Sequence, residues 1–155
     1  FGRCREQGIR TALDTCGCVP WSVLEEVLPL TDLFLYDLKG VDPQKHREWT
    51  GVGNETILDN LIRLTWSRAG HVRIRVPLIP GFNDGDDDLR KMAKFLSRIP
   101  VQGLDVLPYH SFGEAKYRAL GLGYRLSGVP DYDYRLAEEK IPVLRAAVKD
   151  VTIGG

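Results

Sequence analysis

The sequence predicts an α/β fold built on a parallel sheet, and three observations point to it. Short apolar runs alternate along the chain with longer segments whose apolar residues recur at helical spacing. The 155 residues are enough for one domain with a sizeable core. Four strand–helix units are too few for a closed eight-stranded barrel, which needs about 200 residues or more. We therefore expect a fragment of a larger parallel barrel or open sheet.

Each expected element has its own local signal. Strands are predicted where a short apolar or alternating run ends in polar residues, over 9–14, 32–37, 72–79, 104–107 and, more briefly, 151–153. Helices are predicted over 21–28, 54–68, 89–99 and 133–148. Ser22 and Asn54 are candidate caps, the acidic run at 86–88 suits a helix N-terminus, and Pro142 should kink or divide the last helix. Because the first strand starts near residue 1, no element is expected before it.

Composition excludes several classes of protein. The 21 Lys and Arg residues balance 21 Asp and Glu residues, so no charge excess indicates nucleic acid or an anionic membrane as a partner. No apolar run approaches the roughly 18 residues of a membrane-spanning helix, and the first ten residues lack the apolar region of a signal peptide. Three cysteines are too few, and odd in number, for a disulfide scaffold, which favours the reducing cytoplasm.

Chemically active side chains lie at or near the ends of four predicted strands. They are Asp14, Asp37 with Lys39, Arg75 and His110. Because the carboxyl ends of parallel strands meet at one rim, where ligands gather, we expect these side chains to form one site. Taken singly, each has an ordinary explanation: a strand-terminal Asp is often a cap, Lys and Arg are often solvated, and a lone His is often part of a core.

The residue types at this rim indicate the chemistry. Two carboxylates, Asp14 and Asp37, can hold a hard cation together with backbone carbonyls. Lys39 and His110 suit an anionic group such as a carboxylate, and Arg75 can fork onto a carboxylate or a carbonyl. Glycine-rich nucleotide motifs, nucleophile elbows and HExxH are absent from the sequence. The CGC run at 16–18 is a weak metal signal, because Cys4 is the only other cysteine; a turn of small residues explains it better.

Four segments in this order and spacing resemble the activating enzymes of glycyl radical enzymes, of the pyruvate formate-lyase activase type in the radical S-adenosylmethionine superfamily. They are GIRTALDTCG, DLFLYDLKGVDPQKHREWTGVGNETILDNL, VRIRVPLIPGFND and LDVLPYHSFGEAKYRALG. The resemblance implies a partial (β/α)6 barrel in which a [4Fe–4S] cluster, held by a CxxxCxxC loop, cleaves S-adenosylmethionine reductively. The resulting 5′-deoxyadenosyl radical takes hydrogen from a glycine of the partner enzyme. A flavodoxin or a ferredoxin-type protein would supply the electron.

The resemblance also implies roles for single residues. Asp14 and Asp37 would hold a monovalent cation beside the methionyl carboxylate, completed by main-chain oxygens of Thr15 and Leu35. Asp14 would thereby also lie against S-adenosylmethionine.

Three further side chains receive roles from the resemblance. Lys39 and His110 would contact the methionyl group, and Arg75 would lie near the cofactor or the glycine loop of the partner. His46 matches a family signature, although a solvated histidine at a helix start explains it equally well.

The sequence also departs from this family. It holds neither CxxxCxxC nor the GGEP motif that binds the amino group of S-adenosylmethionine, and both belong upstream in the family. Cys16 stands where many members have Asn in DTNG. Residues 1–155 are therefore expected to be the C-terminal two-thirds of an activase, inactive alone.

Other functions stay open. The parent protein could be a different radical S-adenosylmethionine enzyme, such as a ribonucleotide-reductase-type activase or a peptide-modifying enzyme. The LPYH and KYxxLG runs favour the pyruvate formate-lyase type. A non-catalytic barrel fragment that acts as a binding module is the alternative from another class, and a metal-dependent aldolase barrel is a fold-level analogy.

Overall fold

A five-stranded parallel sheet organises the chain in the computed structural model, which describes residues 1–68 and 70–154. Spatial order equals chain order. The strands are β1 (Ala12–Thr15), β2 (Leu33–Asp37), β3 (Val72–Leu78), β4 (Gly103–Pro108) and β5 (Val151–Ile153). Every neighbouring pair is parallel, which confirms the predicted α/β class. Because right-handed crossovers that all step in one direction place their helices on one face, the arrangement is that of an open barrel.

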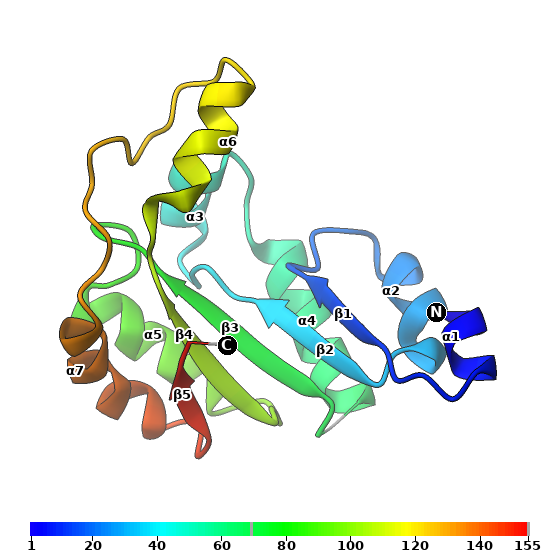
Figure 1. Cartoon of the computed structure of the whole chain (residues 1–155). Helices are drawn as coiled ribbons and strands as arrows, with labels where there is room; N and C mark the ends of the chain where they lie inside the picture. The colour runs from blue at the N-terminus through cyan, green and yellow to red at the C-terminus, as the bar shows by residue number, and fades with distance from the viewer. Residues whose placement is uncertain (69, 155) are drawn as a thin grey trace.

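The helices lie mostly behind the sheet in Figure 1, so that the opposite face of the sheet is open toward the viewer. At the carboxyl ends of the strands, α6 rises above the sheet. The helical elements are α1 (Gly2–Glu6), α2 (Trp21–Val27), the 3-10 turn Leu28–Leu30, α3 (Pro43–Thr50), α4 (Glu55–Ser67), α5 (Asp86–Leu96), the 3-10 turn Ser111–Gly113, α6 (Glu114–Ala119) and α7 (Tyr134–Arg145).

All four predicted helices are present, with local differences. Helix α5 starts at Asp86 rather than at residue 89, because the acidic run forms its first turn instead of preceding it. Asn54 occupies the cap position of α4, but its side chain donates to the carbonyl of Gly40 at 2.9 Å rather than capping the helix. Ser22 lies inside α2, whose cap position is Pro20. Pro142 lies within α7 without dividing it.

Three short helices were not predicted: α1, α3 and α6. Helix α1 corrects the expectation that nothing precedes the first strand. Helix α3 begins after Asp42, whose carboxylate accepts a hydrogen bond from the backbone N–H of Lys45, and ends at Gly51, where φ is +83°. A capping Asp at one end and a left-handed Gly at the other define this eight-residue helix without a long apolar stripe.

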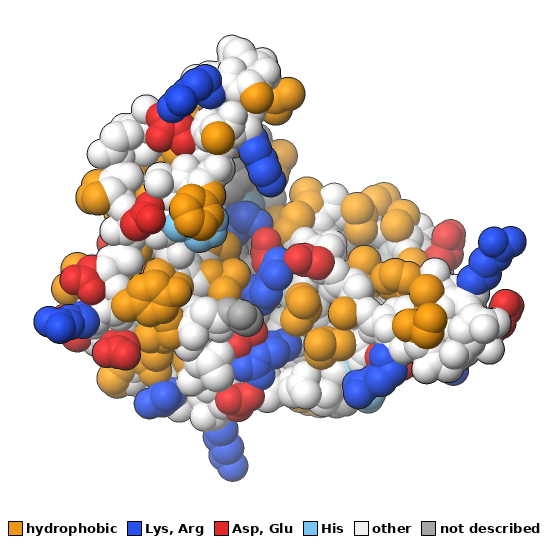
Figure 2. All heavy atoms as spheres, in the orientation of Figure 1, with side chains coloured by type: hydrophobic (Ala, Val, Ile, Leu, Met, Phe, Trp, Pro, Cys, Tyr) orange, Lys and Arg blue, Asp and Glu red, His pale blue; other side chains and the backbone are white. Residues whose placement is uncertain are grey.

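The two faces of the sheet differ in character because side chains alternate along each strand. Toward the helices, β2 and β3 bury Phe34, Tyr36, Ile74 and Val76 completely. Burial of each such side chain stabilises the fold by about 1.5–3 kcal/mol. The open face carries the intervening residues, among which charged side chains are prominent. Figure 2 shows a band of these acidic and basic side chains across the middle of the open face.

No helix in the described part of the chain is both long and apolar enough to cross a lipid bilayer.

Candidate functional site

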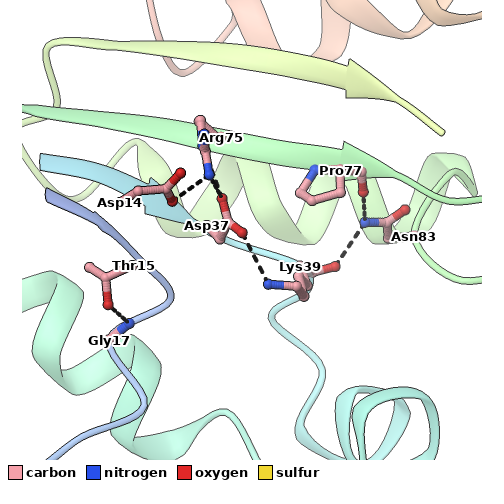
Figure 3. A network of polar contacts seen from close by, with 8 residues as sticks. All are labelled: Asp14, Thr15, Gly17, Asp37, Lys39, Arg75, Pro77 and Asn83. Atoms are coloured by element: carbon pink, nitrogen blue, oxygen red, sulfur yellow. Dashed lines mark hydrogen bonds and ion pairs between the residues drawn. The ribbon is translucent and has the colours of Figure 1, made fainter. Parts of the chain in front are cut away.

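Arg75 is the centre of a charged network on the open face (Figure 3). Its Nη2 donates to Asp37 Oδ1 at 2.8 Å and to Asp14 Oδ1 at 2.5 Å, and its Nε donates to Asp37 Oδ1 at 3.0 Å. The ammonium of Lys39 lies 3.2 Å from the other carboxylate oxygen, Oδ2, of Asp37. Three neighbouring strands and the loop after β2 thus contribute one acid–base cluster.

Strand register explains why these residues meet. Asp37 of β2 lies directly opposite Arg75 of β3, and Asp14 of β1 lies opposite Leu35. Leu35 and Asp37 are two residues apart, so Asp14, Asp37 and Arg75 all belong to the same face of the sheet. The long side chain of Arg75 then reaches across β2 to the carboxylate of Asp14.

The charges in this network support one another. Partial burial would lower the pKa of Arg75, but the hydrogen bonds that it donates to Asp37 and Asp14 outweigh burial and raise the pKa above its usual value. Arg75 is therefore a permanent cation, and together with Lys39 it balances the two carboxylates. The charges of Asp14, Asp37, Lys39 and Arg75 are thus paired with one another within the protein.

The two carboxylates suit a cation, but Arg75 supplies that charge within the chain. One oxygen of Asp14 and one of Asp37 both accept from the same nitrogen, Nη2 of Arg75. In the described residues, no three His, Cys, Asp or Glu side chains gather as a metal site. An external cation between these oxygens would have to displace the guanidinium of Arg75.

The loop after β1 is a tightly packed turn. Gly17 has φ +66°, and a Cβ there would lie 1.8 Å from the hydroxyl oxygen of Tyr36. The amide of Asn60 donates to the carbonyls of Gly17 and Val19 at 2.8 Å each, and the N–H of Gly17 donates to Thr15 Oγ1 at 2.9 Å. These contacts favour the interpretation of CGC as a turn.

A buried amide that the sequence analysis missed holds the carboxyl ends of β2 and β3. Asn83 Nδ2 donates to the carbonyls of Lys39 at 2.8 Å and Pro77 at 2.6 Å, and its Oδ1 accepts from the N–H of Ile79 at 2.7 Å. Asn83 is 1% exposed. It therefore fixes the backbone that carries Lys39, and the polar Asn directly after Pro-Gly-Phe was the available signal.

A cavity of about 630 Å³ lies beside Lys39 at the same rim. His110, which follows β4 and is exposed, lines it together with Lys39 and Arg125, and the described lining residues include no carboxylate. Apolar and aromatic side chains form most of the remaining wall: Trp49, Pro77, Ile79, Phe82, Leu107, Pro108, Tyr109, Tyr117, Tyr124 and Leu126. The cavity is thus electropositive at its polar groups and aromatic elsewhere.

Stacked rings stiffen this wall. Trp49 stacks on Phe82 with centroids 5.0 Å apart, and the guanidinium of Arg125 lies 4.0 Å from the centroid of Trp49. The hydroxyl of Tyr124 donates to Tyr109 at 3.1 Å. Burial and this contact raise the pKa of Tyr109 to about 12, so that its hydroxyl stays protonated at neutral pH.

The predicted site residues therefore fall into two adjoining groups. Asp14, Asp37 and Arg75 form the charged network, His110 lines the cavity, and Lys39 belongs to both. Leu35 stands opposite Asp14 on β2, and the next residue of β1, Thr15, continues into the packed turn.

His46 has a different role from the solvated helix start considered above. It is 3% exposed, and its ring Nδ1 lies 2.8 Å from the carbonyl oxygen of Val52. A carbonyl can only accept, so Nδ1 carries the proton and donates. Thr50 Oγ1 lies 3.1 Å from the same nitrogen. His46 thus secures the turn after α3.

Comparison with known proteins identifies the relatives of this fold and site. No protein-family model matches the sequence. The choline trimethylamine-lyase activating enzyme of Oleidesulfovibrio alaskensis is 44% identical over 135 residues, which cover 82% of this chain and 42% of the relative. The trans-4-hydroxy-L-proline dehydratase activating enzyme of Clostridioides difficile is 35% identical, over 98% of this chain and 51% of its own. Over the matched residues, the chain is similar to glycyl radical enzyme activating enzymes.

A solved structure agrees with this family. A domain of the pyruvate-formate lyase-activating enzyme from Bacteroides vulgatus superposes with a TM-score of 0.78 at 29% identity, over 99% of this chain and 86% of that one. Both predictions, the family and the parallel partial-barrel fold, are thereby confirmed. The chain spans about half the length of the curated activating enzymes that it matches.

Proposed function

We propose that this chain is part of a glycyl radical enzyme activating enzyme and forms one wall of its S-adenosylmethionine site. The supporting observation is the cavity beside Lys39 and His110, which combines positive polar groups with aromatic walls and has no carboxylate among its described lining residues. S-Adenosylmethionine carries a carboxylate at one end and a heteroaromatic base at the other. Both ends find complementary chemistry in this cavity.

Lys39 and His110 bind the carboxylate of the methionyl group in this proposal. Asn83 fixes the backbone at Lys39, so the ammonium starts from a defined position. Arg75 holds Asp37, the carboxylate that also contacts Lys39, and would lie near the cofactor or the inserted glycine loop. When bound and reduced at its cluster, S-adenosylmethionine supplies the radical that takes hydrogen from the glycine of the partner enzyme.

The cation site belongs to the same proposal. Asp14 and Asp37 converge on one point and would hold a monovalent cation there once Arg75 has moved aside, with main-chain oxygens of Thr15 and Leu35 as further ligands. Carboxylate and carbonyl oxygens are suitable ligands for such a cation.

The cluster itself does not fit residues of this chain. Cys4, Cys16 and Cys18 are free thiols, and no metal-holding group of three side chains occurs among the described residues. We place the cluster ligands in sequence outside these 155 residues. The glycine-bearing partner and a flavodoxin or ferredoxin-type donor would complete the system in the cytoplasm.

Calorimetric titration with S-adenosylmethionine tests this assignment. In the anaerobically reconstituted parent protein, Lys39→Ala should weaken binding about tenfold, because a charge-assisted hydrogen bond is lost. Lys94→Ala is the control, since Lys94 is exposed on α5 away from the cavity. Equal affinities for both variants would contradict the assignment.

A second experiment tests the placement of the cluster. Incubation of this chain alone with iron and sulfide, without oxygen, should give no stable cluster and no 5′-deoxyadenosine. A stable cluster chromophore together with 5′-deoxyadenosine would show that this chain alone binds a cluster and cleaves S-adenosylmethionine, contrary to the proposal.

A further inference from the structure

Two arginines occupy the open face of β3, and the one that enters the proposed site has a choice of partners. Arg75 lies opposite Asp37 on β2 and also opposite Asp105 on β4. Among the described residues, the hydrogen bonds of its guanidinium all go to the β2 side, to Asp37 and Asp14. Register alone does not explain this preference, because both neighbouring strands offer a carboxylate at the same level.

The other arginine, Arg73, occupies Asp105. Arg73 Nε donates to Asp105 Oδ2 at 2.7 Å, and Nη2 donates to Oδ1 at 2.6 Å, a bidentate pair. The hydroxyl of Thr152 on β5 donates to Oδ1 as well. Asp105 is 5% exposed; burial tends to raise its pKa, but hydrogen bonds from Arg73 and Thr152 outweigh it and lower the pKa. Both oxygens of Asp105 are thus engaged.

Gly103 makes this pairing possible. It lies directly opposite Arg73 in the β3–β4 ladder, and a Cβ there would come within 2.3 Å of Nη1 of Arg73. The guanidinium therefore lies over β4 in the space that a side chain would fill. Nη1 of Arg73 also donates a hydrogen bond of 2.6 Å to Oδ2 of Asp150. Asp105 and Asp150 hold Arg73 toward β4, and Gly103 leaves room for its guanidinium.

We propose that the Arg73–Asp105 pair positions Arg75. By satisfying the carboxylate that competes for Arg75, it directs Arg75 across β2 to Asp37 and Asp14. Its consequence for S-adenosylmethionine rests on the proposed function, whereas the direction of Arg75 is a property of this chain alone. Arg73 and Asp105 are positioning residues, since they act on the site through Arg75.

Crystal structures of three proteins test the geometry: wild type, Arg73→Gln and the double variant Arg73→Gln with Asp105→Asn. With Arg73 replaced, Asp105 lacks its bidentate partner and should draw Arg75 away from Asp14. Replacing Asp105 as well removes the competitor, so Arg75 should return to Asp37 and Asp14. Arg75 unmoved in the single variant, or still displaced in the double variant, would overturn the proposal. If Arg73→Gln does not fold, Gly103→Ala replaces it in the test. This substitution crowds the guanidinium of Arg73 and should displace Arg75 in the same way.

Affinity for S-adenosylmethionine in the reconstituted parent protein is the second measurement. With tetramethylammonium as the only buffer cation, no external ion can replace Arg75 between Asp14 and Asp37. Under this condition Arg73→Gln should weaken binding about tenfold, and the double variant should recover to within about twofold of wild type. A structural defect alone would not be rescued by a second substitution. Arg90→Gln, which breaks an exposed pair on α5, is the control and should bind as wild type does. Absence of binding by wild type would refute the proposed function, while the crystal structures would still decide how Arg75 is directed.

Discussion

Arg75 and Asp37 face each other directly across β3 and β2, and two nitrogens of the guanidinium donate to a single carboxylate oxygen of Asp37. The same guanidinium also reaches Asp14. The protein thereby carries a cation of its own at the point where two carboxylates converge. An external cation and Arg75 compete for these oxygens, because both satisfy the same negative charge.

This competition can be measured without any cofactor. In Arg75→Gln the two carboxylates lose their shared cation, so monovalent cations should stabilise the variant. The thermal midpoint of the variant should be higher in potassium or sodium chloride than in tetramethylammonium chloride at equal ionic strength, whereas wild type should differ little. Adding Asp37→Asn to Arg75→Gln should abolish the difference. A variant midpoint that does not depend on the ion would contradict a cation site at Asp14 and Asp37.

Acid should remove the contribution of Asp105 to stability. Its pKa is lowered from the usual 3.8 in the folded state, so the ionised form is favoured by folding. That stabilisation is complete above pH 3.8 and is lost as the pH falls through the lower folded-state value. Urea unfolding should therefore show Asp105→Asn to be less stable than wild type at pH 7, with a gap that narrows toward pH 3.

A surface carboxylate provides the control for this pH series. Asp59→Asn on α4 removes the charge of an exposed carboxylate that, among the described residues, pairs only with Arg63. The stability of this variant should follow wild type to within about 0.5 kcal/mol across the range. If the stability difference between Asp105→Asn and wild type stays constant with pH, the charge of the Asp105 carboxylate does not contribute to folding stability.

Substitutions at two glycines with nearly equal φ angles distinguish backbone strain from steric crowding by a neighbouring side chain. Gly17 has φ +66° and Gly8 has φ +69°, but a Cβ would strike the hydroxyl of Tyr36 only at Gly17. Tyr36 cannot easily yield, because it is fully buried and donates to the carbonyl of Ile57 at 2.7 Å. Gly17→Ala should therefore cost about 1–3 kcal/mol more than Gly8→Ala. Equal unfolding free energies for the two variants would mean that the turn after β1 can relax.

Much of the site was predictable from the sequence, because the site is formed by residues at the ends of parallel strands. Carboxyl ends of such strands meet at one rim, so the polar residues after four apolar runs were expected together. Asp14, Asp37 and Lys39 are joined through charged contacts, and Lys39 and His110 share a cavity. The parallel sheet and the four predicted helices followed from apolar periodicity in the same way.

What was missed depends on pairings between distant segments. That Arg73 binds Asp105, 32 residues away, follows only once the β3–β4 register is known. Asn60 reaches the turn after β1 from the middle of α4, where its sequence context shows only a helix. His46 was judged by its place in a helix, although its burial depends on the turn at Val52. Local patterns carry no information about such contacts.

Asn83 offers a test of whether backbone order at the rim controls ligand binding. Its amide makes three hydrogen bonds to backbone groups of Lys39, Pro77 and Ile79, all in a buried setting. Asn83→Ala takes a donor from two carbonyls and the acceptor from one N–H, and it should destabilise the fold by about 2–4 kcal/mol. Asn83→Asp keeps the acceptor for Ile79 but loses both donors, and it places a carboxylate against two carbonyls.

These variants distinguish positioning from bulk stability. Should Asn83 act by placing Lys39, Asn83→Ala should weaken S-adenosylmethionine binding further than its fraction of unfolded protein accounts for. Leu96→Ala provides a control: Leu96 is a fully enclosed α5 residue, and its loss should lower stability by about 2–5 kcal/mol while leaving the rim in place. Titration at a temperature where both variants are folded makes the comparison. Equal affinities for the two would mean that Lys39 finds its position without the bridge from Asn83.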